Sequence, residues 1–164
     1  VTHHPAMLAQ IIRGDEVVGI HRTYLDSDGP GKASVPSPKK IIKCADTISG
    51  GSIRLFEPEQ DKPLVLCEGI ETALAIRDYS DWPVWSCVNS TMLEKVELPD
   101  SIKSVYIGAD KDLSGDGQES AAKLAQCLVN EGREVKISLP PMEIPEGSNS
   151  VDWLDYLNKE VTYA

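Results

Sequence analysis

The chain has 164 residues, of which 41% are hydrophobic and 26% are charged, and its formal net charge is −10. This length suits one medium domain, or one core domain with a small appendage. No apolar run approaches the roughly 20 residues that a membrane-spanning helix needs, and no secretion signal opens the sequence. An integral membrane protein is therefore excluded, and we expect a cytoplasmic protein. The start at Val1 suggests a fragment excised from a longer chain.

The charge is unevenly spread. Residues 1–61 contain seven Lys and Arg against eight Asp and Glu, whereas residues 62–164 contain nine against 18. A phosphate-binding protein is usually basic, so the acidic part indicates carboxylates held near metal ions, or a solvated surface. The basic residues of the first third are Arg22, Lys32, Lys39, Lys40 and Lys43.

The first third of the chain is rich in β-favouring residues. Residues 8–13 and 16–25 flank a Gly-Asp turn and predict an antiparallel hairpin. Residues 26–52 are rich in Gly, Ser, Pro and Lys and predict a long loop. Residues 52–56 fit a further strand. We expect a small β-rich N-terminal element with a long Pro/Gly/Lys loop.

A polar, proline-bounded linker at residues 57–63 separates this element, residues 1–61, from a second domain over residues 62–164. In the second domain strands and helices alternate. The expected strands cover residues 64–67, 84–88, 104–109 and 134–139, and the expected helices cover 70–79, a short segment capped by Asn89 or Ser90, 117–130 and 151–157. Such alternation predicts an α/β fold with a parallel sheet and helices on both faces.

Acidic residues follow two of the expected strands. Asp110 and Asp112 come after residues 104–109, and alternation along an extended chain points them to one side. Two such carboxylates repel each other, and a hard divalent cation relieves that repulsion. Glu68 follows residues 64–67. Because ligands bind at the carboxyl ends of parallel strands, we expect these three acids to meet there.

The Cys-Glu-Gly at residues 67–69, followed about forty residues later by Gly-Ala-Asp-Lys-Asp at 108–112, resembles the Toprim domain shared by bacterial primases, topoisomerases and some nucleases. Residues 66–74 and 17–26 resemble the primase segment of phage- and plasmid-type primase–helicases. The Toprim similarity covers about residues 62–158. It implies a Rossmann-like parallel sheet flanked by helices.

The resemblance also implies an activity. The full protein would be a DNA primase that makes RNA primers on single-stranded DNA from nucleoside triphosphates, by nucleotidyl transfer that depends on Mg²⁺ or Mn²⁺. Helicase and zinc-binding modules would be its partners in the full-length protein. No Gly-x-x-x-x-Gly-Lys-Ser/Thr phosphate loop of a helicase motor occurs in this chain. The alternatives are a Toprim nuclease or topoisomerase-like strand cleavage, or a non-catalytic module that binds nucleic acid or a partner.

Roles for site residues follow from the resemblance. Asp110 and Asp112 match the metal ligands, and Asp152 is a further candidate ligand. Glu68 matches the single glutamate that handles protons at the nucleophile or leaving oxygen. Gly69 matches a position of close approach to a nucleotide, beside a helix N-terminus that favours phosphate. The alternatives are that Glu68 only caps or forms an ion pair, and that Asp152 is an ordinary acid at a helix start.

Other acids have less specific contexts. Glu71 lies one turn beyond Glu68 and either faces solvent or takes part in the site. Asp116 with Glu119 fits a cap of the helix at 117–130, with metal binding by Asp116 as the alternative. The loop at residues 114–117 departs from the family, in which it is often shorter, so the metal geometry there is open.

The basic residues Arg22, Lys39, Lys40 and Lys43 are candidates for binding nucleic acid or nucleotide, with a solvated loop as the alternative. The four cysteines lack Cys-x-x-Cys spacing and are expected to be reduced thiols, with a zinc site shared with histidines as the alternative. They are Cys44, Cys67, Cys87 and Cys127. We expect the tryptophans to pack in or around the core rather than to stack on bases.

Overall fold

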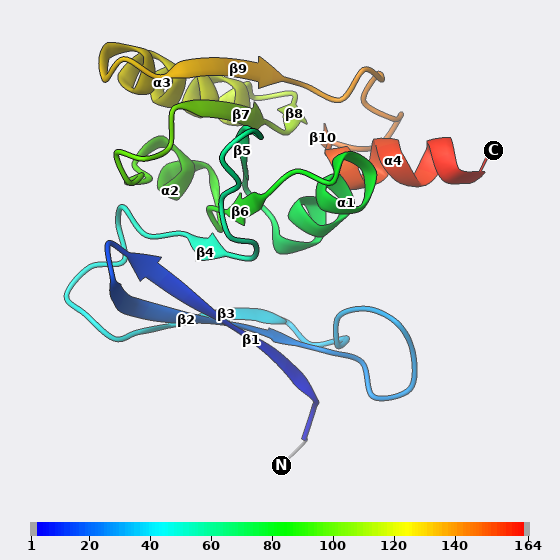
Figure 1. Cartoon of the computed structure of the whole chain (residues 1–164). Coiled ribbons are helices and arrows are strands. Elements are labelled where there is room, and N and C mark those ends of the chain that lie inside the picture. Colours follow the sequence, from blue (N-terminus) through cyan, green and yellow to red (C-terminus); the bar gives the residue numbers. More distant parts are fainter. Residues whose placement is uncertain (1–2, 163–164) are drawn as a thin grey trace.

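The computed structural model describes the backbone of residues 3–162 and the side chains of residues 3–159. A three-stranded sheet lies against one side of a five-stranded sheet that helices flank (Figure 1). A two-stranded ribbon completes the fold near the start of the last helix. No helix within residues 3–162 is both long and apolar enough to cross a membrane.

The three-stranded sheet is antiparallel and contains β1 (Ala6–Arg13), β2 (Glu16–Tyr24) and β3 (Lys39–Lys43) in that order. The predicted hairpin is confirmed: β1 and β2 pair around Gly14, whose φ of 56° favours glycine. The prediction of a loop throughout residues 26–52 is wrong, since β3 lies within it. Pairing with β2 supplies the backbone hydrogen bonds of β3, which its lysine-rich sequence did not indicate.

The five-stranded sheet confirms the predicted α/β fold. Its order is β4 (Ile53–Arg54), β6 (Val84–Ser86), β5 (Leu64–Cys67), β7 (Ser104–Gly108) and β9 (Glu134–Ser138). All neighbours are parallel except the pair of β4 and β6. The central strand β5 is buried at every residue, as expected of a parallel strand covered on both faces.

Helices cover both faces of this sheet (Figure 1). They are α1 (Ile70–Ser80), α2 (Ser90–Glu94), α3 (Asp116–Asn130) and α4 (Trp153–Thr162). Side chains of α2 and α3 share one core cluster with the sheet, and those of α1 and α4 share another. In α1 the structure buries Ile76, whereas Leu74 is 42% exposed.

The chain just before α4 also differs from expectation. Residues 151–152 were expected to be helical, but β10 (Ser150–Val151) pairs with β8 (Lys111–Asp112) as a short antiparallel ribbon. The ribbon ties the end of the acidic segment to the start of α4. It thereby brings Asp152 toward the carboxyl edge of the five-stranded sheet.

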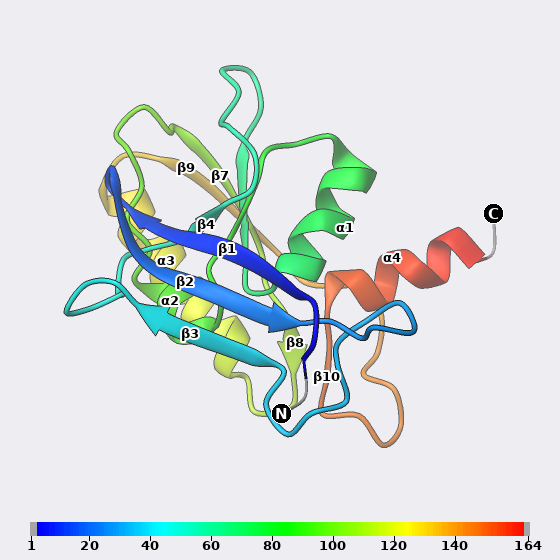
Figure 2. The same ribbon diagram turned by 90° about the horizontal axis from the view of Figure 1, so that it is seen from below.

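The three-stranded sheet packs onto the rest of the molecule through a third apolar cluster, which contains Ile11, Val18 and Ile53 together with Ile70 of α1 and Met92 of α2. Figure 2 shows this sheet in front of the larger one. Since β4 precedes residue 61 yet pairs with β6, the two parts share backbone hydrogen bonds. The division into domains at residue 61 stays a prediction.

Candidate active site

The acids singled out from the sequence lie at one edge of the five-stranded sheet. Glu68 directly follows β5, and Asp110 lies two residues after β7. Since β5 and β7 are parallel neighbours, their carboxyl ends coincide. Asp112 is the last residue of β8. The charges of Glu68, Asp112 and Asp152 each raise the pKa of Asp110, so the four acids share one electrostatic environment.

Asp110 is the least compensated of these groups. Its Oδ1 is buried and has no hydrogen-bond partner within the described part of the chain. Burial, followed by the charges of Glu68, Asp152 and Asp112, raises the pKa of Asp110 to about 7. A buried polar atom normally has a partner, so this oxygen is available to a further hydrogen-bond donor or to a cation.

Glu68 is held by strand β6 on one side and faces Asp112 on the other. The Ser86 hydroxyl donates a hydrogen bond of 2.7 Å to the backbone oxygen of Glu68. Burial and then the charge of Asp112 raise the pKa of the Glu68 carboxyl. A raised pKa brings a carboxyl group nearer to the range in which it exchanges protons during catalysis.

Asp112 has the opposite environment. The loop after β8 wraps around its carboxylate and donates four hydrogen bonds to it. The donors are the Ser114 hydroxyl and the amides of Gly115, Asp116 and Gly117, at 2.6, 2.6, 3.2 and 2.9 Å. Burial alone would raise the pKa of Asp112, but these bonds lower it. The Oδ2 atom accepts only one of the four bonds and keeps room for a second partner.

This arrangement corrects the expected cap of α3. The helix begins at Asp116, so its N-cap is Gly115, which has no side chain to form a cap bond. Asp112 instead accepts from the first free amides, since the turn at residues 114–115 folds back over it. Asp116 lies in the first turn, where a negative charge is still favourable. Glu119 forms an ion pair of 3.0 Å with Lys123.

Gly117 was not recognised from the sequence, yet it fits tightly between the acids. A Cβ atom at this position would lie 2.9 Å from Asp112 Oδ2, 3.1 Å from the backbone carbonyl oxygen of Asp110 and 3.5 Å from Glu68 Oε1. Glycine is thus required by close approach rather than by backbone conformation. The only sequence signal was the departure of the 114–117 loop from the family pattern.

Gln118 is a second residue that was missed. Its Nε2 donates to the backbone oxygen of Asp112 at 3.0 Å, and its Oε1 accepts from the Asp112 amide at 3.4 Å. It therefore fixes the backbone of Asp112 from the first turn of α3. No pattern in the sequence points to this contact.

Asp152 lies beside the cluster, but both of its carboxylate oxygens already accept hydrogen bonds. Its Oδ2 accepts from the Thr72 hydroxyl at 3.1 Å, and its Oδ1 accepts from the Asp155 amide at 2.8 Å. Asp155 in turn accepts from the Asp152 amide at 3.2 Å. Asp152 thus stabilises the start of α4 and links it to α1, while its charge still acts on Asp110.

The acids suit a divalent metal in charge and donor type. As they lie, no three His, Cys, Asp or Glu side chains among residues 3–159 converge closely enough to hold an ion. The unpartnered Oδ1 of Asp110 nevertheless offers a hard oxygen ligand. Asp112 Oδ2 and Glu68 Oε1 both lie near Gly117. Carboxylate oxygens of this kind are the ligands that Mg²⁺ prefers, so we judge that the residues fit the ion.

The remaining predicted residues near the edge have other surroundings. Gly69 is the residue before α1, with an ordinary φ of −88°, and no side chain caps the amides that follow it. Glu71 neither faces open solvent nor joins the acids, because Lys32 and Lys39 bind its carboxylate at 2.9 and 3.2 Å. The proposed nucleotide contact of Gly69 stays a prediction.

The basic residues fall on two faces of the three-stranded sheet. Arg22 pairs with Lys40 across β2 and β3, and both lie near the Tyr24 ring, at 4.8 and 5.8 Å from its centroid. Lys39, the adjacent residue, points to the opposite face and reaches Glu71. Lys43 is exposed at the end of β3. Arg22 and Lys40 thus form an outer cationic pair from which Lys39 is separated.

The cysteines and tryptophans are placed as expected. Cys67 and Cys87 are buried free thiols whose pKa values burial raises, which keeps them unreactive. Cys44 and Cys127 are free and exposed. Trp85 is 1% exposed and lies in the core.

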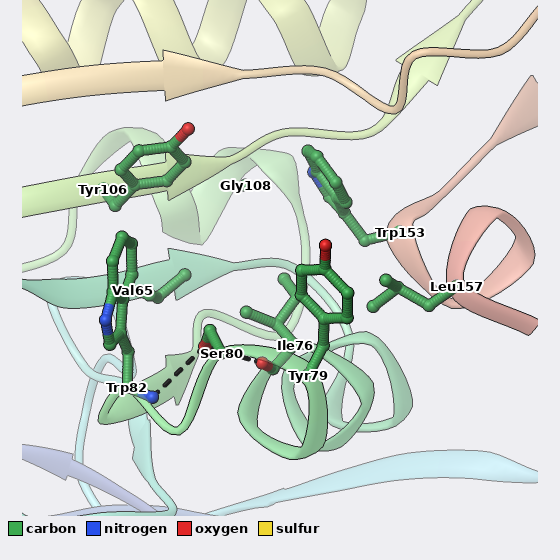
Figure 3. A pocket seen from close by; sticks show the side chains of 9 residues that line it. All are labelled: Val65, Ile76, Tyr79, Ser80, Trp82, Tyr106, Gly108, Trp153 and Leu157. Atoms are coloured by element: carbon green, nitrogen blue, oxygen red, sulfur yellow. Dashed lines mark hydrogen bonds between the residues drawn. The ribbon is translucent and has the colours of Figure 1, made fainter. Parts of the chain in front are cut away.

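Trp82 and Trp153 border an apolar cavity of about 320 Å³ between α1 and α4 (Figure 3). Figure 3 shows Trp82 and Tyr106 on one side of it, and Trp153 with Leu157 on the other. None of its lining residues is acidic, so the carboxylate cluster lies outside this cavity. The two tryptophans therefore pack at the rim of the core.

Comparisons with known proteins agree with this architecture. A family model described as a Toprim domain matches residues 63–162. A second, described as a domain of unknown function (DUF7146), matches residues 1–55. The comparison with curated proteins found no match.

Three solved structures share the fold at low sequence identity. The zinc-binding and RNA polymerase domains of the Aquifex aeolicus primase align with a TM-score of 0.58 and 18% identity, over 96% of this chain and 37% of that one. A DNA primase domain from Pseudomonas aeruginosa gives 0.53 and 14%, over 94% and 47%. The DnaG catalytic core gives 0.56 and 15%, over 94% and 48%.

The chain therefore spans less than half the length of each of these structures, and at such identities the likeness shows the fold alone. The family model matches residues 63–162, which is more than half of the 164 residues of the chain. With its parallel sheet, its flanking helices and the acids at the carboxyl edge, the chain belongs to the Toprim domain family.

Proposed function

We propose that this chain is the catalytic core of a DNA primase, which makes RNA primers on single-stranded DNA by Mg²⁺- or Mn²⁺-dependent nucleotidyl transfer. The observation that carries the proposal is the unpartnered, half-buried carboxylate of Asp110 among Glu68, Asp112 and Asp152. Like charges collected in this way, with no basic side chain of the described residues paired to them, suit a site that gains a divalent cation. The likeness of the fold to primase catalytic cores supports the choice of reaction.

Each site residue would have a separate role. Asp110 and Asp112 would hold the metal ion, which when bound neutralises charge on the transferring phosphate. Glu68, with its raised pKa, would accept or donate a proton at the nucleophile or leaving oxygen. Gly117 and Gln118 would position Asp112. Asp152, engaged with Thr72, would contribute through its charge unless its carboxylate rotates to become a further ligand.

Single-stranded DNA would cross the outer cationic pair. No carboxylate of the described residues forms an ion pair with Arg22 or Lys40, and Lys43 is exposed on the same strand as Lys40. Phosphate contacts of this type position a strand without reading its sequence. In the full-length protein, helicase and zinc-binding modules would be the partners.

The test is a primer-synthesis assay with the full-length protein, single-stranded DNA, ribonucleoside triphosphates and Mg²⁺. We expect short RNA products that depend on the metal and disappear in the Asp110→Asn/Asp112→Asn variant. A labelled strand in the same reaction should stay intact. Cleavage of that strand without synthesis would establish the nuclease alternative, and binding without either activity would leave only the binding module.

A further inference from the structure

A small chamber lies between the inner face of the three-stranded sheet and the first turn of α1. It is a cavity of about 300 Å³, bordered by Thr23 of β2, Lys32 of the following loop and Glu71 of α1. The rest of its lining is apolar and consists of Met7, Leu25, Gly31, Ile70 and Leu74. The chamber is separate from the carboxylate cluster, although Glu71 is only three residues from Glu68.

Two ammonium groups share the carboxylate of Glu71, one from Lys32, which lines the chamber, and one from Lys39, which reaches Glu71 from beside it. Lys32 Nζ lies 2.9 Å from Glu71 Oε1, and Lys39 Nζ lies 3.2 Å from Glu71 Oε2. The three side chains therefore carry a net positive charge. Burial alone would raise the pKa of Glu71, but its bond to Lys32 and the charge of Lys39 hold the pKa at about 2. Glu71 is thus ionised at every pH at which the protein would work.

Two buried polar atoms on the inner face of β2, one of them on a residue that lines the chamber, have no partner in the described part of the chain. Thr23 Oγ1 and His21 Nδ1 have no hydrogen-bond partner in the described part of the chain, and their residues are only 1% and 5% exposed. Both residues point to the face of the sheet that Lys39 shares, because Thr23 pairs with Lys39 and His21 lies two residues away on β2. Leaving such groups unpaired is unfavourable, which indicates a ligand that the structure does not contain.

We propose that Glu71 is an internal counter-ion, and that a polyphosphate displaces its carboxylate from an anion site formed by Lys32, Lys39 and Thr23. A polyphosphate has more charge and more acceptor oxygens than one carboxylate, so it can bind both lysines and accept from the Thr23 hydroxyl together. The identification of this anion as the tail of a nucleoside triphosphate rests on the proposed function, whereas the anion site itself does not.

Displacement of Glu71 is energetically accessible. The side chains of Lys32 and Lys39 are each 42% exposed, and that of Glu71 is 31% exposed. Ion pairs with this much exposure contribute little to stability, so Glu71 can leave when a stronger anion arrives. The exchange would also free the first turn of α1, directly beyond Glu68 and Gly69.

The test is calorimetry of the whole chain with inorganic tripolyphosphate, without divalent metal. We expect Glu71→Gln to bind roughly two- to fivefold more tightly than the wild type, because the competing charge is gone. Lys39→Ala should bind about tenfold more weakly. Lys136→Ala, which removes the same charge from an exposed strand position outside the chamber, should bind like the wild type.

A second measurement covers the case in which a variant fails to fold. In a ¹H–¹⁵N NMR titration of the wild type, tripolyphosphate should shift the amides of Thr23, Lys32 and Glu71 before those at the acidic edge. Unchanged or weaker binding by Glu71→Gln, equal losses in Lys39→Ala and Lys136→Ala, or shifts elsewhere would each overturn the proposal. Since neither experiment uses metal or primer synthesis, failure here is distinguishable from failure of the proposed reaction.

Discussion

The acidic edge of the five-stranded sheet and the basic inner face of the three-stranded sheet differ in how their charged side chains are paired. At the acidic edge, Asp110 lies among three other acids, no basic side chain of the described residues is paired with it, and its pKa rises to about 7. On the basic face, Lys32 and Lys39 bind Glu71, whose pKa falls to about 2. Among the described residues no basic side chain forms an ion pair with the acids of the first region, whereas the second region contains its own counter-ion, Glu71.

This difference indicates what each region needs from outside. A cluster of like charges becomes stable when a ligand of opposite charge binds, so the acidic edge should gain stability from a cation. The basic face is already paired with Glu71, so it gains stability only when a stronger anion replaces that carboxylate. The two regions should therefore respond differently to mutation, pH and salt.

The largest expected effect is on the chemistry at the acidic edge. In the full-length protein, Glu68→Gln should reduce primer synthesis by about 10²- to 10⁴-fold, because the amide keeps the size of the side chain but cannot exchange a proton. Metal affinity should largely remain. Synthesis assays alongside Mn²⁺ binding measure both quantities, and near-normal synthesis would remove Glu68 from the reaction.

A second prediction concerns pH and compares two neighbouring acids. The pKa of Asp110 is about 7, above its unfolded value, so folding favours the protonated form and wild-type stability falls as the pH rises from about 4 to 7. Without metal, Asp110→Asn should therefore exceed the wild type by on the order of 2 kcal/mol at pH 8 and lose this advantage at pH 4.

Asp112→Asn provides the opposite case. The folded pKa of Asp112 is lowered, so its stabilising contribution is present above its unfolded pKa and is lost as the pH falls through the folded one. This variant should be less stable than the wild type at pH 8, and the difference should shrink in acid. Thermal denaturation between pH 3 and pH 8 measures both variants, and parallel curves for the two would contradict the assignment.

A third prediction tests the close packing around Asp112. Gly117→Ala should lower the free energy of unfolding by about 1–3 kcal/mol, since the added Cβ would lie 2.9 Å from Asp112 Oδ2. Gly29→Ala is the matched control, because its Cβ would have no neighbour closer than 4.0 Å. Urea denaturation compares the two variants. Equal stability would contradict the tight packing, because it would mean that the Asp112 side chain and its loop move aside at little cost.

The smallest effect concerns DNA binding by the outer cationic pair, Arg22 and Lys40. Replacing Arg22 and Lys40 by alanine should flatten the log–log salt dependence of single-stranded DNA binding by roughly 1.4, or about 0.7 for each lost phosphate contact. Lys39→Ala should change the slope less, because Glu71 already neutralises Lys39. Fluorescence anisotropy at several salt concentrations, with and without Mg²⁺, measures the slopes. An equal effect of Lys39 and Lys40 would contradict the division into two faces.

Much of the fold was predictable because local patterns and tertiary structure agree. The buried strand β5, the amphipathic helix α3 and the Gly-Asp hairpin each have a distinct sequence pattern. Strand β3 was missed because its lysines and isoleucines are exposed and it forms only through pairing with β2. The ribbon of β8 and β10 likewise depends on two segments distant in sequence.

The acidic site was predictable in its location but not in its geometry. Strand ends and spacing place Glu68, Asp110 and Asp112 together. They do not reveal that Asp112 is surrounded by donors while Asp110 has none. That asymmetry comes from the path of the loop at residues 114–117, which is a property of the folded backbone.

The most direct test of the account is Mn²⁺ binding to this chain, measured by electron paramagnetic resonance or calorimetry. The wild type should bind Mn²⁺ weakly but saturably, and Mg²⁺ should compete. Asp110→Asn should abolish binding with the fold intact, because Asp110 supplies the one buried carboxylate oxygen without a hydrogen-bond partner in the described part of the chain. Undiminished Mn²⁺ binding by a folded Asp110→Asn/Asp112→Asn variant would contradict the assignment of the acidic edge as the metal site.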